Sequence, residues 1–293
     1  EAERVAPKNL AVNRGLLLSY LQSGNLASAA TLANQALALW PQDPPLLHWA
    51  GLTYFKEGKL PLAIETLQRS ERLDGAHSDI HFDLALALLS DKQYDPARTH
   101  LEVAVKLDPS NAMAHLLLGR AEENSNRTLE AIKHFQAALK LSPSLPLGHY
   151  HLGFAYASLG HTPEAIAEYE KEMAHAPDNF NVVYQLGRCL ALTGEVKHAI
   201  PPLEKAVRLD PQSYDAAYEL GKALLMNGDA AGAVAASRQA AELNPADPSP
   251  HYQIARAFEK MGDQTEAQVE WRRFAELKKQ RTETGGMATG QLQ

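Results

Sequence analysis

Small residues recur along this chain at an interval of 34 residues, and this interval restricts the fold more than any other feature. One series contains only glycine or alanine: Gly51, Ala85, Gly119, Gly153, Gly187, Gly221 and Ala255. A second contains only alanine: Ala29, Ala63, Ala97, Ala131, Ala165, Ala199, Ala233 and Ala267. A third is proline with one glycine: Pro41, Gly75, Pro109, Pro143, Pro177, Pro211 and Pro245. Three series in one register predict a tandem array of similar structural units.

Residues 146–179 show how one repeat is expected to fold. An apolar stripe with helical spacing, i, i+3, i+4 and i+7, consists of His149, Leu152, Gly153 and Tyr156. Gly160 is predicted to end this first helix, and Pro163 suits the first turn of a second helix. Gly153 and Ala165 are small, so we expect the two helices to cross in contact there. Such a helix pair cannot bury its stripe alone and needs neighbouring pairs.

In this register the chain resembles the tetratricopeptide repeat family over roughly residues 10–281. Eight repeats without insertion are expected, at residues 10–43, 44–77, 78–111, 112–145, 146–179, 180–213, 214–247 and 248–281. The resemblance implies an all-α fold, a right-handed α-solenoid (superhelix) of antiparallel helix pairs. It also implies that the first helices line a concave groove that holds peptides. These repeats specify a fold much more closely than a function.

The two ends of the chain lie outside the eight repeats. Pro7 and Ala2 precede Pro41 and Ala36 by 34 residues, which indicates the end of a truncated upstream repeat in residues 1–9. A plain N-terminal tail is the equally weighted alternative. Residues 282–293 are expected to form a disordered tail.

Four places depart from the repeat pattern. Lys92 and Asn126 stand where the other repeats have a turn glycine, and Lys92 predicts a mildly strained turn or a different turn geometry. Glu122 lies in the apolar stripe and must reach solvent or find a partner. Pro201 and Pro202 predict that the second helix of the sixth repeat starts late, near residues 198–200, or bends.

Composition and motifs exclude several classes of function. The net charge is −7 without a basic cluster, so we expect no nucleic acid partner. No apolar run approaches the roughly 18 residues of a membrane span. No nucleotide, hydrolase, zincin or paired-cysteine motif occurs, so we expect neither an enzyme nor a cofactor. The single cysteine, Cys189, is interpreted as a small buried residue.

Twelve histidines raise the question of a metal site. Four of them share one packing position between helices, and they are His81, His115, His149 and His251. Two other repeats have Leu47 and Val183 at this position, which favours packing. We therefore expect no metal.

The first helices carry a second stripe that is not polar, as a purely water-facing stripe would be. Candidate groove residues in the first repeats are Phe55, Phe82, Leu86 and Arg120. Later repeats supply aromatic candidates, namely Tyr150, Phe154, Tyr184, Tyr218 and Tyr252, and cations, namely Arg188, Lys222 and Arg256. Tyrosine and arginine often carry binding energy, and the cations suit an acidic segment. The alternative is that the tyrosines pack against neighbouring helices while the cations are solvated.

These features favour a protein–protein interaction scaffold that binds a peptide or a helix of a partner, with an acidic segment suited to the cations. A second hypothesis is the substrate-recruiting region of a larger enzyme. A third is a self-assembling module, a homo-oligomer formed through the C-terminal helix with Trp271 and Phe274. The Lys–Asn set of chaperone-binding members and the asparagine ladder of O-linked N-acetylglucosamine transferase are both absent, so neither function transfers.

Overall fold

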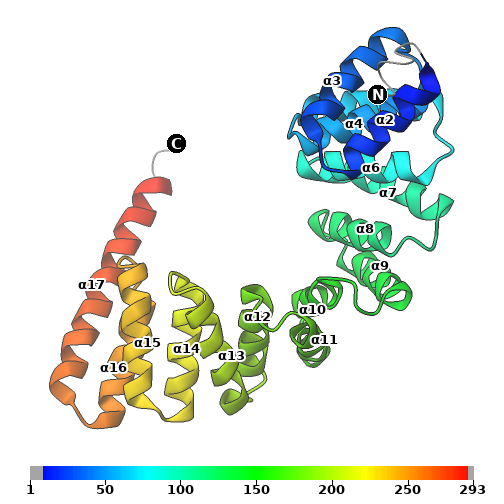
Figure 1. The fold of residues 1–293 in the computed structure, drawn as a ribbon. Coiled ribbons are helices and arrows are strands. Elements are labelled where there is room, and N and C mark those ends of the chain that lie inside the picture. Colours follow the sequence, from blue (N-terminus) through cyan, green and yellow to red (C-terminus); the bar gives the residue numbers. More distant parts are fainter. Residues whose placement is uncertain (1–8, 290–293) are drawn as a thin grey trace. The chain divides into compact units, whose positions relative to one another are not determined.

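The computed structural model describes residues 9–289, with side chains to residue 282, and the expected truncated repeat in residues 1–9 lies almost entirely outside this range. Contacts divide the chain into two compact parts, an N-terminal part that ends at Gly148 and a C-terminal part that begins at His149. Each part is a stack of helix pairs coloured in chain order in Figure 1. Among the described helices, none is long and apolar enough to cross a membrane.

The N-terminal part contains four helix pairs among its described residues. They are α2 (Leu10–Gln22) with α3 (Leu26–Leu39), α4 (Pro44–Lys56) with α5 (Leu60–Leu73), α6 (Ser78–Ser90) with α7 (Tyr94–Leu107), and α8 (Ala112–Asn124) with α9 (Thr128–Leu141). The helices of each pair pack on each other, and the second helix of each pair packs on the next first helix. This arrangement buries the stripes that a single pair leaves open.

The C-terminal part repeats the arrangement. Its pairs are α10 (Gly148–Ser158) with α11 (Thr162–His175), α12 (Phe180–Leu192) with α13 (Val196–Leu209), α14 (Tyr214–Asn227) with α15 (Ala230–Leu243), and α16 (Ser249–Met261) with α17 (Gln264–Thr289). Figure 1 shows α12 to α17 following one another in sequence order. The eight helix pairs within residues 9–289 confirm the expected all-α solenoid and the count of repeats.

Local sequence explains where the helices begin and end. Among the described first helices, α2, α4, α8, α12 and α14 have polar N-caps whose side chains accept hydrogen bonds from backbone N–H groups, namely Asn9, Asp43, Asn111, Asn179 and Ser213. The turn between paired helices needs a positive φ angle, which the repeated glycine supplies; Gly160, for example, has a φ of 78°. Lys92 and Asn126 adopt the same conformation, with φ angles of 61° and 58°. A strained turn at Lys92 is therefore confirmed, and a different turn geometry is excluded.

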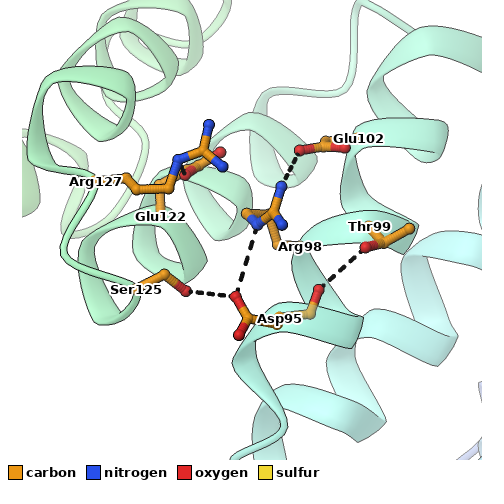
Figure 2. Close-up of polar contacts among 7 residues, drawn as sticks. All are labelled: Asp95, Arg98, Thr99, Glu102, Glu122, Ser125 and Arg127. Atoms are coloured by element: carbon orange, nitrogen blue, oxygen red, sulfur yellow. Dashed lines mark hydrogen bonds and ion pairs between the residues drawn. The ribbon is translucent and has the colours of Figure 1, made fainter.

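Glu122 is buried on α8, and its partner comes from the turn that follows this helix. Arg127 Nε lies 2.8 Å from Glu122 Oε2, as Figure 2 shows. Around this pair, Ser125 donates to Asp95 Oδ1 over 3.1 Å, and Asp95 lies 3.9 Å from Arg98. The expectation that Glu122 needs a partner is confirmed, and the network ties the turn after α8 to α7.

Two helix ends differ from the expected positions. Helix α13 begins at Val196 and runs without interruption past both prolines, so it does not start late; a bend at this point stays a prediction. Prolines 201 and 202 withhold N–H groups from the carbonyls of Lys197 and His198, which are exposed residues that water can serve. At the C-terminus, α17 continues to Thr289 instead of ending near Thr282, and residues 290–293 lie outside the described chain.

Candidate functional site

In the C-terminal part three first helices, α12, α14 and α16, contact one another in succession. Helix α12 contacts α14, and α14 contacts α16, whereas the described second helices α13, α15 and α17 make no comparable contacts with one another. The stack in this part therefore curves toward its first helices. We call the side of α10, α12, α14 and α16 that carries the tyrosine and cation rows the inner face.

The four tyrosines of the predicted row occupy equivalent positions on α10, α12, α14 and α16. Tyr150, Tyr184 and Tyr218 are half-buried, while the side chain of Tyr252 is 46% exposed. Phe180 stacks on Tyr184 with ring centroids 5.8 Å apart, and Tyr214 stacks on Tyr218 at 5.8 Å. The rings are therefore held in place by intramolecular packing and still present an edge to solvent. Burial raises the pKa of the Tyr184 hydroxyl, so this group stays protonated near neutral pH.

The three cations lie one helical turn after three of these tyrosines. Arg188 is half-buried and acts on the hydroxyl of Tyr184, whose raised pKa it partly opposes. Lys222 Nζ lies 3.5 Å from Glu219 Oε2 on the same helix. Arg256 Nη1 lies 2.7 Å from Glu259 Oε2, also on its own helix. Two cations of the row thus have a local carboxylate partner, which lowers the net positive charge of the inner face.

Sequence reasoning missed two apolar residues on this face. Leu192 and Met226 lie four residues after Arg188 and Lys222, and their side chains are 63% and 53% exposed. A helix brings residues i and i+4 to the same side. Leu192 on α12 and Met226 on α14 therefore extend the tyrosine–cation series of each helix by one more turn. Leu192 and Met226 could have been predicted from the sequence by repeating the i+4 step that connects the tyrosines to the cations. Phe154 on α10 is also exposed, at the position that the cations occupy in the later repeats.

The candidates of the N-terminal part are placed differently. Phe55, Phe82 and Leu86 are half-buried and pack against the core formed by α5 to α8. Arg120 is exposed on α8 and lies near Glu123. Burial raises the pKa of the Glu123 carboxyl, and the charge of Arg120 partly opposes this rise. The three apolar side chains thus contribute mainly to the core. Among the described residues, these N-terminal candidates do not form a row of aromatic side chains like the tyrosine row of the C-terminal part.

The C-terminal rings continue the aromatic packing of the inner face. Trp271 lies 5.3 Å from Tyr252 between ring centroids, and Phe274 lies 5.8 Å from Tyr252. Trp271 Nε1 also donates to Glu259 Oε1 over 2.9 Å. Both rings are half-buried. Self-assembly stays a prediction.

Comparison with known families supports the architecture. The family model of the tetratricopeptide repeat matches residues 82–146, 150–213 and 199–248, which together make up more than half of the chain. The chain belongs to the tetratricopeptide repeat family. A second family model, that of subunit 3 of the anaphase-promoting complex, or cyclosome, matches residues 22–104.

Individual relatives of this tetratricopeptide repeat protein are distant. It is 31% identical over 121 residues to a BBSome complex member, the BBS4 homolog of Drosophila melanogaster, covering 40% of this chain and 25% of the relative. The chain therefore spans about a quarter of the curated relative's length. The C-terminal part of a repeat protein from Cytophaga hutchinsonii superimposes with a TM-score of 0.65 at 18% identity, over 82% of this chain and 99% of the other. YrrB, a protein described as having an unusual peptide-binding site, gives 0.58 at 20% identity, over 60% and 91%. These two likenesses show the fold alone.

Proposed function

We propose that the inner face of the C-terminal part binds a carboxylate-bearing segment of another protein. The fold itself is consistent with a protein-interaction scaffold, as its family is generally non-enzymatic. The observation that carries the proposal is the arrangement on α12 and α14. On each of these helices a packed tyrosine, a cation and an exposed apolar side chain succeed one another by one turn, ending at Leu192 and Met226.

This arrangement combines two kinds of contact. Leu192, Met226 and the ring of Tyr252 offer apolar surface, whose burial contributes about 25 cal/mol per Å². Arg188, Lys222 and Arg256 offer charge-assisted hydrogen bonds to carboxylates. The ion pairs of Lys222 and Arg256 are partly exposed, and pairs of this kind contribute only about 0–1 kcal/mol. A partner carboxylate can therefore replace Glu219 or Glu259 at small cost.

A selection from random 12-residue peptides displayed on phage tests the proposal with the full chain as bait. We expect the selected peptides to be enriched in Asp and Glu next to apolar residues. Synthetic peptides from this selection are then titrated at low and high salt. The triple variant Arg188→Ala, Lys222→Ala, Arg256→Ala is expected to bind about tenfold more weakly, because each partly exposed cation contributes up to about 1 kcal/mol.

The matched control changes three exposed cations on the second helices of the same part, Lys197→Ala, Arg208→Ala and Arg272→Ala. It alters the net charge equally, and we expect it to leave affinity unchanged. Salt dependence should flatten only in the inner-face variant, because exposed charges are screened over about 8–10 Å. Equal binding by both variants would show that the inner face is not the site. The apolar zone of Phe55, Phe82 and Leu86 would then be the better candidate.

Recruitment of a substrate to an enzyme domain is compatible with the same surface. In that case the selected peptides would resemble the substrate, and the described residues would still supply only binding. Expression of the complete coding sequence, followed by titration of its product with the same peptides, would distinguish this alternative from a free-standing scaffold.

A further inference from the structure

Three side chains with metal-binding chemistry converge in the N-terminal part, and none of them is a candidate groove residue. Glu71 lies near the end of α5, His81 is on α6, and His100 is on α7. Each offers one ligand atom, and these atoms lie within 4.8 Å of one another. Among the residues that the structure describes, this is the one group of three or more such side chains.

The distances between the three ligand atoms suit a single ion. His81 Nδ1 lies 3.2 Å from His100 Nδ1, and Glu71 Oε1 lies 3.7 Å from the first and 3.6 Å from the second. Zinc binds nitrogen and oxygen ligands at about 2.0–2.2 Å in a tetrahedron, which places ligand atoms about 3.3–3.6 Å apart. The triangle therefore needs adjustments of only a few tenths of an ångström to accept the ion.

The other nitrogen of His81 is already used in the way that metal ligation requires. His81 Nε2 lies 3.0 Å from the carbonyl oxygen of Gly75, to which it donates. This hydrogen bond leaves Nδ1 without a proton and therefore available as a ligand. Metal-ligating histidines usually donate their second N–H to a carbonyl or carboxylate, which fixes the tautomer and the ring orientation.

We propose that Glu71, His81 and His100 form a binding site for a divalent transition ion of the zinc class. His81 is buried and His100 half-buried, while the Glu71 side chain is 26% exposed. The exposed side leaves room for water as the fourth ligand. The three ligands come from α5, α6 and α7, so the ion would connect the second repeat to both helices of the third.

An equivalent histidine pair in the next repeat provides an internal comparison. His115 Nδ1 lies 3.3 Å from His134 Nδ1, and His115 Nε2 lies 3.3 Å from the carbonyl oxygen of Pro109. The pair therefore has the same geometry as His81 and His100. The position equivalent to Glu71, however, is Val105. The third ligand is thus what distinguishes the proposed site from a histidine pair that only packs.

Zinc titration of the full chain, after removal of metals with a chelator, tests the proposal. Isothermal titration calorimetry should detect one Zn²⁺ per chain at the tightest site, and the melting temperature should rise with Zn²⁺ concentration because the ion binds only the folded state. Mg²⁺ should produce neither effect, because it prefers six oxygen ligands. Glu71→Gln and His100→Gln should each weaken Zn²⁺ binding at least tenfold. Both variants should retain the circular dichroism spectrum of the wild type.

The control His134→Gln removes one member of the comparison pair and should retain the zinc affinity of the wild type. Three results would overturn the proposal: absence of Zn²⁺ binding below about 100 μM, unchanged binding by Glu71→Gln, or equal losses in His134→Gln and His100→Gln. The first would leave a histidine–histidine hydrogen bond as the role of the pair. Because the probe is the ion alone, failure here does not affect the proposed inner face.

Discussion

The ring of Tyr169 lies against the backbone of Gly153. A Cβ atom at Gly153 would come within 3.0 Å of Tyr169 Cε1 and within 3.2 Å of the carbonyl oxygen of Ala165. Tyr169 and Ala165 are both fully buried, so neither helix can move away without opening the core. The first helix of this repeat therefore has no room for a large side chain at the crossing, as the 34-residue series of glycine and alanine predicts.

Gly153→Leu should destabilise the C-terminal part. The leucine side chain has no space between α10 and α11, and overpacking of this kind typically costs about 1–3 kcal/mol. Thermal and urea unfolding should both show a lower midpoint. Gly15→Leu is the matched control, because among the described residues no atom beyond the local backbone of α2 lies within 4 Å of its Cβ position. There leucine should be neutral or stabilising, since it favours a helix more than glycine does. Equal midpoints for wild type and Gly153→Leu would contradict the close crossing.

Glu123 should make stability depend on pH. It is half-buried on α8, and burial raises the pKa of its carboxyl to about 7, partly opposed by Arg120. Because the pKa in the folded state exceeds the value of about 4.5 in the unfolded chain, the stabilisation is complete below pH 4.5. It is lost as the pH rises through about 7. Glu123→Gln, which mimics the protonated form, should therefore raise the melting temperature at pH 8 and change it little at pH 4.5.

Glu204→Gln serves as the control for this pH comparison, because Glu204 is exposed on α13. Its effect on the melting temperature should be small and the same at both pH values. If Glu123→Gln also shows the same effect at pH 4.5 and pH 8, the carboxyl of Glu123 does not titrate in this range. Its burial would then be compensated by a contact that forms only in solution.

The repeats were predictable because each small residue has one mechanical role. Glycine at 153 and alanine at 165 identify the helix crossing, and glycine at 160 identifies the turn. The start of the fifth repeat was less predictable. Helix α10 begins at Gly148, after Leu147 with a positive φ of 63°, whereas the register placed the start at residue 146. Gly148 packs tightly on Leu139, since a Cβ there would lie 2.7 Å from Leu139 Cδ2.

Pairs of side chains on different helices were not visible in the sequence. The packing position of His81 was correctly predicted to be buried, but its neighbour His100 lies 19 residues away on the facing helix. The same offset joins His149 Nδ1 to Glu168 Oε2 at 2.5 Å and His251 Nδ1 to Glu270 Oε2 at 2.6 Å. The 34-residue period aligns equivalent positions of different repeats. It does not show which non-equivalent positions are in contact. The side chains that surround the tyrosine and cation rows likewise come from several helices, so the repeat register alone does not identify them.

Cys189 should be unreactive in the native protein. The thiol is buried on α12, and burial raises its pKa, with a smaller opposing effect of Arg188. At pH 8 the group is therefore a protonated thiol without solvent access, whereas the thiolate is the nucleophile. A disulfide reagent such as DTNB should react at the rate of global or local unfolding and rapidly in guanidinium chloride. Fast stoichiometric reaction without denaturant would contradict the buried position.

Replacement of a proline should distinguish the interior of α13 from the first turn of α11. Pro201 lies in the sixth position of α13 and withholds an N–H from the carbonyl of Lys197, whereas Pro163 lies in the first turn of α11, where no such bond is needed. Both side chains are exposed, so packing changes little in either case. Pro201→Ala should raise the urea midpoint, because it restores a helix hydrogen bond. The free energy of unfolding should increase by up to about 3 kcal/mol. Pro163→Ala should leave the midpoint unchanged or lower it, because the fixed φ of proline favours a helix start. If Pro201→Ala lowers the midpoint instead, the proline stabilises α13 through a bend that the alanine helix cannot adopt.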